Sequence, residues 1–374
     1  MFGRSFRVGR IGGVEIRVDA SWTVIALLIT YSLFLQFTAA YPTLTSPAGF
    51  ALALAAAVLF FGSVLTHEMT HALVARRVGI PVMGITLFIF GGATHADVAS
   101  KGPKDEFVVS VVGPLSSLAL GGIFWSLSIL AHALLLPRPL QGALGYLGWV
   151  NGLLAAFNLL PGFPLDGGRV FRSAVWGATH SLERATRAAS ILGETIGYLM
   201  VAGGFVLVFG AAVVSGIWFA AIGWFLAQAA RASWREFEVR GLLAGAEVEQ
   251  VMEPHPIAIP ADLPLSEAVD HYLLPHDQGA FPVEELGRTV GMLTIGLVRA
   301  VPRSAWERRT VREAMAPVDE RTIVGPHTPM AEVLKRLEEQ PSGFVLVMAD
   351  GQIEGVVTVA DLGTWLHRRQ SLAA

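Results

Sequence analysis

The chain has 374 residues, of which 53% are hydrophobic and only 15% are charged. Soluble globular proteins carry about a quarter charged residues, so this composition argues against a purely soluble protein. The sequence has no cysteine, which excludes disulfides, thiolate nucleophiles and cysteine-ligated zinc. Residues 1–240 hold 16 Lys and Arg against 11 Asp and Glu, whereas residues 241–374 hold 11 against 19. No dense basic patch is present, so nucleic acid is not expected as a partner.

Long stretches with little or no charge predict six membrane-spanning helices in the first 240 residues. A helix needs about 20 apolar residues to cross roughly 30 Å of hydrocarbon. Residues 20–75 contain one charged residue, Glu68, and the proline-containing segment 41–47 divides them into two spans. The uncharged stretch 195–230 is too long for one crossing, so we expect it to fold back near Gly210. The spans are expected near residues 21–40, 50–75, 107–136, 143–160, 190–209 and 213–231.

The distribution of Lys and Arg predicts the orientation of these helices. Basic residues gather before the first span and after the second, fourth and sixth spans. The three loops on the opposite side contribute only Arg138. Because cytoplasmic loops carry the excess of Lys and Arg, we expect both termini to be cytoplasmic.

The second span contains a potential metal-binding motif, His67-Glu68-Met69-Thr70-His71. Histidines four residues apart lie on one helical face and can point at one metal ion. Glu68 lies beside them, where a carboxylate can accept a proton from water at the metal. Ionisable groups inside a membrane helix are costly unless they are neutralised, paired or bound to a metal. The motif therefore indicates a functional site rather than a chance match.

A catalytic zinc ion usually has three protein ligands and a water molecule, so a third ligand is expected. Asp166 is the preferred candidate, because it follows the fourth span in a segment with two prolines and two glycines. Prolines end a helix, glycines let the backbone approach a ligand, and irregular backbone at membrane depth must be buried or line a wet cavity. An interfacial helix cap is the alternative role for Asp166. The less favoured candidates are His95, Asp97, His132, His180 and Glu194.

The last third of the sequence contains a weak duplication with a spacing of about 64 residues. The segment 251–254 corresponds to 314–317, 265–269 to 330–334, and 290–294 to 354–358. Each copy is expected to fold as strand–helix–strand–strand–helix, and two copies would pack as one pseudo-symmetric unit.

This duplication resembles a pair of CBS domains, at about residues 247–302 and 311–370. The resemblance implies that ATP or AMP binds between the copies, with a Thr/Ser-x-x-Asp sequence holding the ribose. Thr358 and Asp361 supply that sequence in the second copy, whereas the first copy has Thr294 but Leu297 in place of the aspartate. A packing module without ligand, or one that forms a homodimer through the CBS pair, is the alternative.

Residues 1–240 resemble the site-2 protease family of intramembrane metalloproteases, in the subgroup with a C-terminal CBS pair. His67, Glu68 and His71, followed by Asn158 and Asp166 in a Pro-Leu-Asp-Gly-Gly context, carry the resemblance. It implies one Zn²⁺ bound by the two histidines and the aspartate, with Glu68 as general base. Asn158, and also Asn151, correspond to the family's asparagines and are candidates to stabilise the oxyanion. Met69 and Thr70 replace the family's usual small residues, and Gly91 and Gly92 follow an apolar strand, as in the family.

The expected fold class is thus a polytopic α-helical membrane domain (1–240) with a small β element, followed by a soluble α/β tandem CBS domain (241–374). The resemblance implies an intramembrane zinc endopeptidase in the cell membrane of a prokaryote, surrounded by lipid, that cleaves a membrane-anchored regulatory protein. The apolar segment 84–92 is expected to form a strand. This strand either binds an unwound substrate by strand addition or only packs as part of a hairpin. The alternative function is a CBS-gated ion or metal transporter, with the same three ligands as a transport site.

Overall fold

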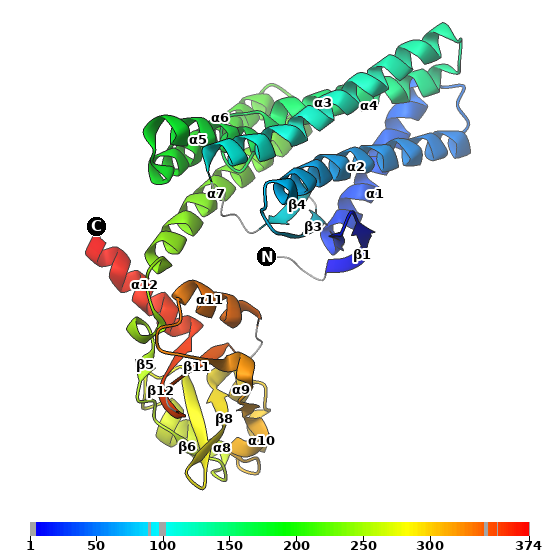
Figure 1. Ribbon diagram of the computed structural model, residues 1–374. Coiled ribbons are helices and arrows are strands. Elements are labelled where there is room, and N and C mark those ends of the chain that lie inside the picture. The colour runs from blue at the N-terminus through cyan, green and yellow to red at the C-terminus, as the bar shows by residue number, and fades with distance from the viewer. Residues whose placement is uncertain (1–4, 89–90, 97–101, 340–342, 350, 374) are drawn as a thin grey trace. The chain divides into compact units, whose positions relative to one another are not determined.

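The computed structural model describes residues 5–88, 91–96, 102–339, 343–349 and 351–373. The chain divides into two compact units, Met1–Arg235 and Glu236–Ala374. The division falls inside the long helix α7 (Val213–Leu243), which is labelled in Figure 1. It falls there because Val239 and Leu243, in the last turns of α7, pack in the hydrophobic core of the second unit.

Five helices of the described chain are long and apolar enough to cross a membrane. They are α1 (Ala20–Ala40), α2 (Ser46–Arg77), α3 (Pro103–Ala133), α6 (Leu182–Phe209) and α7. They coincide with the first, second, third, fifth and sixth predicted spans. A helix also forms at the fourth, α4 (Arg138–Asn158), but its polar residues Gln141 and Asn151 and several glycines make it less apolar. The crossing by α4 therefore stays a prediction.

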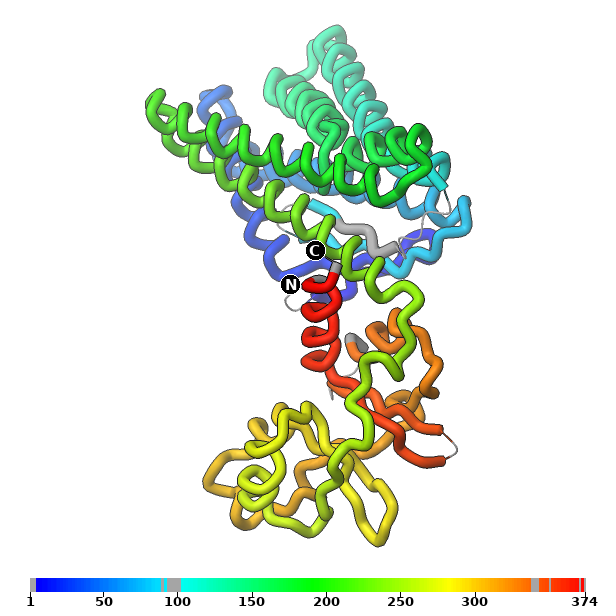
Figure 2. Tube along the Cα trace, turned by 90° about the vertical axis from the view of Figure 1, so that its left-hand side faces the viewer, coloured from blue at the N-terminus to red at the C-terminus, as the bar shows by residue number. Residues whose placement is uncertain are grey.

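Helices α6 and α7 form a close antiparallel pair. The turn between them lies at residues 210–212, as expected from the length of the uncharged stretch. A Cβ on Gly204 would lie 2.6 Å from the carbonyl oxygen of Gly216, and one on Gly197 would lie 2.6 Å from that of Gly223. Small residues let helix backbones approach closely inside a membrane, and Figure 2 shows the two helices side by side.

A four-stranded sheet packs beside the membrane helices in the order β1-β2-β3-β4. The strands are β1 (Ser5–Ile11), β2 (Val14–Asp19), β3 (Val82–Phe88) and β4 (Gly91–Ala96). Ile85 of β3 pairs with Ile16 of β2 in parallel, and Leu87 pairs with Gly92 of β4 in antiparallel fashion. Ile85 and Leu87 pack with Val64 and Ala72 of α2. The sheet is thus fixed against the helix that carries the His-Glu motif.

The predicted strand at 84–92 is confirmed as β structure, in two strands, with residues 89–90 outside the described part. Substrate addition to the part of this segment in β3 is wrong, whereas addition at Gly91 and Gly92, which lie in β4, stays a prediction. Strand β3 already pairs with β2 on one side and β4 on the other, so its backbone edges are both used. Among the described residues, the edges of the sheet that pair on one side only are those of β1 and β4.

The second unit contains the predicted duplication. One sheet has the order β6 (Ile259–Pro260), β7 (Ala280–Glu285), β8 (Arg288–Thr294), β9 (Ala316–Pro317), and the other β10 (Ile323–Val324), β11 (Phe344–Ala349), β12 (Gln352–Thr358), β5 (Glu253–Pro254). The helices are α8 (Leu265–Ala268), α9 (Ile295–Arg299), α10 (Val311–Ala314), α11 (Met330–Glu339) and α12 (Val359–Ala373). Each copy exchanges its first short strand with the other sheet, and Met292, Phe344 and Val356 join the copies in a shared core.

Candidate metal centre

Three side chains from two helices meet at one point in the first unit. His67 and His71 lie one turn apart on α2, and Asp166 is the first residue of α5 (Asp166–Thr179). Oδ2 of Asp166 lies 3.0 Å from Nε2 of His67 and 3.1 Å from Nε2 of His71, and the two Nε2 atoms are 3.2 Å apart. The side chains are 5%, 9% and 16% exposed in the order His67, His71, Asp166. The structure thus brings together all three predicted ligands.

Residues of helix α3 contact the Nδ1 atoms of both histidine rings. Nδ1 of His71 lies 2.6 Å from the carbonyl oxygen of Val109, which can only accept a hydrogen bond. Nδ1 of His71 therefore carries a proton, which leaves Nε2 as the ring nitrogen that can bind a metal. Nδ1 of His67 lies 2.9 Å from Oγ of the fully buried Ser117, and Nε2 of this ring faces Asp166 as well. Such outer partners fix the tautomer and direction of metal-binding histidines.

Glycines allow Asp166 to reach the histidines. The loop after α4 turns back through Pro161 and Pro164, and α5 then begins at Asp166. A Cβ on Gly167 would lie 2.3 Å from the carbonyl oxygen of Leu159, and one on Gly168 would lie 2.3 Å from the carbonyl carbon of Gly162. Side chains at these positions would push α5 away from the loop, so the glycines are needed for this close packing.

Two further glycines bring backbone up to the same centre. A Cβ on Gly113 of α3 would lie 2.1 Å from Nε2 of His71 and 2.8 Å from Nε2 of His67. A Cβ on Gly92 of β4 would lie 2.3 Å from Cγ of Glu68. The half-buried Glu68 therefore lies between the histidines of its own helix and the start of β4.

The donor set fits a zinc ion. Two imidazole nitrogens and a carboxylate oxygen are typical ligands of catalytic zinc, which keeps a fourth position open. Zinc–nitrogen bonds of about 2.0 Å in tetrahedral geometry place neighbouring donors about 3.3 Å apart. The three separations of 3.0, 3.1 and 3.2 Å are close to that value.

Neither predicted asparagine contacts these three donors in the described structure. The amide of Asn158 donates to the carbonyl of Leu154 in its own helix, at 3.0 Å. Asn151 is fully buried and donates to Oγ of Ser63, which lies one turn before His67 on α2. Asn151 thus ties α4 to α2 beside the centre, and its buried Oδ1 has no hydrogen-bond partner.

The less favoured candidate ligands lie elsewhere. His132 contacts Gln141 near the far end of α3, His180 ends α5 in a left-handed conformation, and Glu194 pairs with Arg231. The backbone of His95 lies in β4, and Asp97 is outside the described residues. No sequence pattern marks Ser117, Gly113 or the Val109 carbonyl, because their role follows from the packing of α3 on α2.

The predicted ribose-binding residues of the second unit bind each other. Oδ2 of Asp361 accepts from the backbone N–H of Thr358 at 2.8 Å and from its hydroxyl at 2.7 Å, which caps the start of α12. A cavity of about 660 Å³ opens beside Arg288 and Gln352. Gln352 and Ile353 at the start of β12 line this cavity, whereas Thr358 and Asp361 are not among its lining residues.

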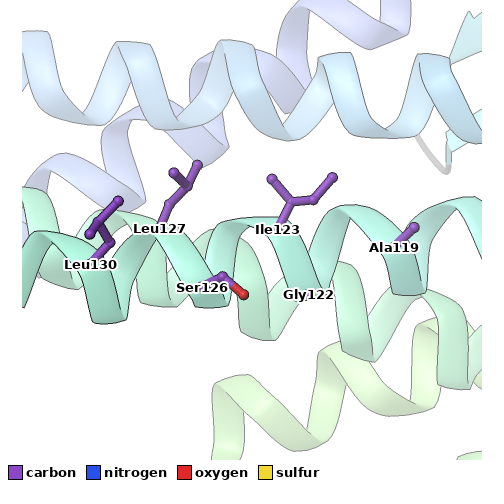
Figure 3. Close-up of a pocket in the computed structure, with 6 residues that line it drawn as sticks. All are labelled: Ala119, Gly122, Ile123, Ser126, Leu127 and Leu130. Carbon is purple, nitrogen blue, oxygen red and sulfur yellow. The ribbon is translucent and has the colours of Figure 1, made fainter.

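Another groove, of about 420 Å³, lies along α3 and has no ionisable lining residue. Figure 3 shows its lining, which consists of Ala119, Gly122, Ile123, Ser126, Leu127 and Leu130. Because these side chains offer no acid, base or metal ligand, the chemistry of the protein is expected at the histidine–aspartate centre instead.

Comparisons with known proteins agree with this geometry. The model of peptidase family M50 matches residues 55–136 and 135–204, and the CBS domain model matches residues 248–301 and 311–368. The zinc metalloprotease sll0528 of Synechocystis sp. is 33% identical over 365 residues, covering 96% of this chain and 94% of the relative. The chain belongs to peptidase family M50, the site-2 protease family.

A second relative of this M50 peptidase is the zinc metalloprotease Rip3 of Mycobacterium tuberculosis. It is 32% identical over 357 residues, covering 95% of this chain and 91% of Rip3. A solved site-2 protease from Methanocaldococcus jannaschii is 23% identical and covers 62% of this chain and 95% of its own, with a TM-score of 0.41. This M50 peptidase is therefore a zinc metalloprotease with membrane-spanning helices and a pair of CBS domains.

Proposed function

We propose that this M50 peptidase cleaves a membrane-anchored regulatory protein within or next to its transmembrane segment. The observation that carries this proposal is the meeting of His67, His71 and Asp166 within 3.2 Å, on helices of an apolar domain. Membership of a peptidase family supports this function over a CBS-gated transporter. The position of Glu68 also supports it, because a transport site would give this carboxylate no catalytic role.

In the proposed mechanism, His67, His71 and Asp166 hold one zinc ion. As a Lewis acid, a zinc ion held there would polarise the scissile carbonyl and lower the pKa of a water molecule. Glu68 accepts a proton from the attacking water and then delivers it to the leaving amide nitrogen. Asn158 or Asn151 would donate a hydrogen bond to the developing oxyanion after its amide leaves the hydrogen bond that it makes in this structure, to Leu154 or to Ser63 respectively.

We further propose that the substrate is bound as an extended strand at β4. A transmembrane helix hides its carbonyls in i→i−4 hydrogen bonds, so it must unwind before cleavage. In the described sheet β4 pairs only with β3, and its Gly92 approaches Glu68. An unwound segment that adds to this edge would bring its carbonyls towards the base.

The proposed domain plan is a membrane peptidase of residues 1–240 and a regulatory CBS pair of residues 241–374. Six spans, α4 included, would place both termini in the cytoplasm of a prokaryotic cell, with the basic loops on that side. The CBS pair would bind ATP or AMP at Thr358 and Asp361, or join two chains as a homodimer. Asp361 then has to hold a ribose while it caps α12.

Cleavage of a fluorescent transmembrane peptide in lipid vesicles, combined with zinc analysis, tests the proposal. Wild-type protein is expected to contain one zinc ion and to cleave the peptide. Glu68→Gln should keep the zinc and lose turnover, whereas Asp166→Ala should lose both. Zinc retained by Asp166→Ala, or cleavage by Glu68→Gln, would contradict the assignment of these residues.

A further inference from the structure

A buried ion pair connects α3 to α5 close to the metal centre. Nε of Arg172 lies 2.6 Å from Oε1 of Glu106, and Nη2 contacts the same oxygen. The side chains are 12% and 2% exposed, respectively. Burying two charges costs several kcal/mol per ion, and apolar residues of similar volume are often as stable. The pair is therefore better explained by the geometry that it fixes than by net stability.

Arg172 also fixes the loop that leads to Asp166. Its guanidinium carbon lies 5.1 Å from the ring centre of Phe163, a buried residue of that loop. The backbone N–H of Phe163 donates to the carbonyl of Ala189 on α6, at 3.2 Å. One guanidinium thus contacts both α3 and the loop from its own position on α5, and a planar cation suits this combination of ion pair and ring stacking.

The other end of the ion pair lies on the helix that orients the histidines. Glu106 is three residues from Val109, about 4.5 Å along α3, and Val109 accepts from His71. Ser117, on the same helix, contacts His67. Because α3 fixes both rings, any shift of α5 against α3 moves Asp166 relative to the histidines.

We propose that Glu106 and Arg172 are positioning residues, which hold Asp166 at bonding distance from the metal that His67 and His71 bind. This inference rests on the proposed zinc site. Zinc–ligand distances tolerate changes of only about 0.2 Å, so a small displacement of α5 is enough to weaken binding.

The test replaces both charges with apolar groups of similar size, in Glu106→Leu combined with Arg172→Met. The control is Glu194→Leu combined with Arg231→Met, which removes a more exposed pair whose side chains are 31% and 41% exposed, respectively. That control pair is also an Arg–Glu pair next to an aromatic ring, with Arg231 5.4 Å from the ring centre of Tyr198. It joins α6 to α7 and contacts neither α3 nor α5 in the interactions described. Arg172→Lys is the third variant, because it keeps the charge opposite Glu106 without the planar group.

The readouts are the zinc dissociation constant, from competition with a chelator, and the visible spectrum of the Co²⁺-substituted protein. We expect the Glu106/Arg172 double variant to bind zinc about 10- to 100-fold more weakly, the loss typical when an outer partner is removed. Its cobalt bands should shift, and kcat should fall with little change in KM. The Glu194/Arg231 variant should match wild type.

Arg172→Lys keeps the inference testable if the double variant does not fold, and should show the same band shift with a smaller loss of affinity. Wild-type cobalt spectra and zinc affinity in every folded Glu106 or Arg172 variant would overturn the positioning role. Equal losses in the Glu194/Arg231 control would also overturn it, because they would indicate a general effect of removing ion pairs. Failure of wild-type protein to bind zinc would instead overturn the proposed function.

Discussion

The substitution Gly113→Ala tests whether backbone of α3 directly faces the metal ligands. The added Cβ would lie 2.1 Å from Nε2 of His71 and 2.8 Å from Nε2 of His67. Carbon atoms approach such neighbours to about 3.5 Å, so the His71 ring or α3 must move by more than about 1 Å. That displacement is several times the roughly 0.2 Å tolerance of zinc–ligand bonds.

We expect Gly113→Ala to weaken zinc binding by about 100-fold or more. Removing a hydrogen-bond partner of a metal ligand typically weakens metal binding by about 10- to 100-fold, so this loss would be at least as large as the top of that range. Helix unfolding does not explain such a loss, because alanine favours a helix over glycine by about 1 kcal/mol. Chelator competition measures the zinc affinity, and circular dichroism in detergent checks that the helices remain.

Gly122→Ala is the matched control, because it makes the same change on the same helix where a Cβ would have no neighbour within 4 Å. It should bind zinc as wild type does. If Gly113→Ala also binds zinc within about twofold of wild type, the donors do not converge against α3 and the reasoning fails.

Glu68→Gln should reduce peptide cleavage by about 10²- to 10⁴-fold without changing zinc content, and wild-type turnover would exclude Glu68 as the base. Asp361→Ala should destabilise the second unit by about 1 kcal/mol, measured by thermal unfolding, and abolish calorimetric ATP binding; ATP binding that survives would place the nucleotide elsewhere. The hydrogen bond to Glu247 raises the pKa of the exposed His327. The pair therefore contributes its full stabilisation of the folded second unit below pH about 6.5, and this contribution is lost as the pH rises through the raised pKa. The melting temperature of His327→Gln should therefore differ from wild type at pH 6 more than at pH 8, and a constant difference would contradict the pairing.

Much of the fold of this chain can be predicted from patterns of consecutive residues. Uncharged stretches locate membrane helices because apolar length is a property of consecutive residues. The duplication after residue 247 was visible because each copy repeats the same short elements. The β3–β4 hairpin was visible as a β-forming run, but its position inside a sheet was not, because β2 lies more than 60 residues earlier in the sequence. Helix α5 was missed because a loop motif rich in glycine and proline obscures its start.

The two histidine ligands can be predicted from the sequence, since a helix places residues four apart on one face and the spacing puts His67 and His71 side by side. The contact of Asp166 with these histidines follows from the folded structure, because its approach depends on Gly167 and Gly168, which pack against the backbone of Leu159 and Gly162. The tertiary structure also decided that α3 orients both rings, through Ser117 and a carbonyl that no sequence motif marks. Contacts between helices depend on which faces pack together. The packing of those faces depends on all the elements of the domain and not on any one segment.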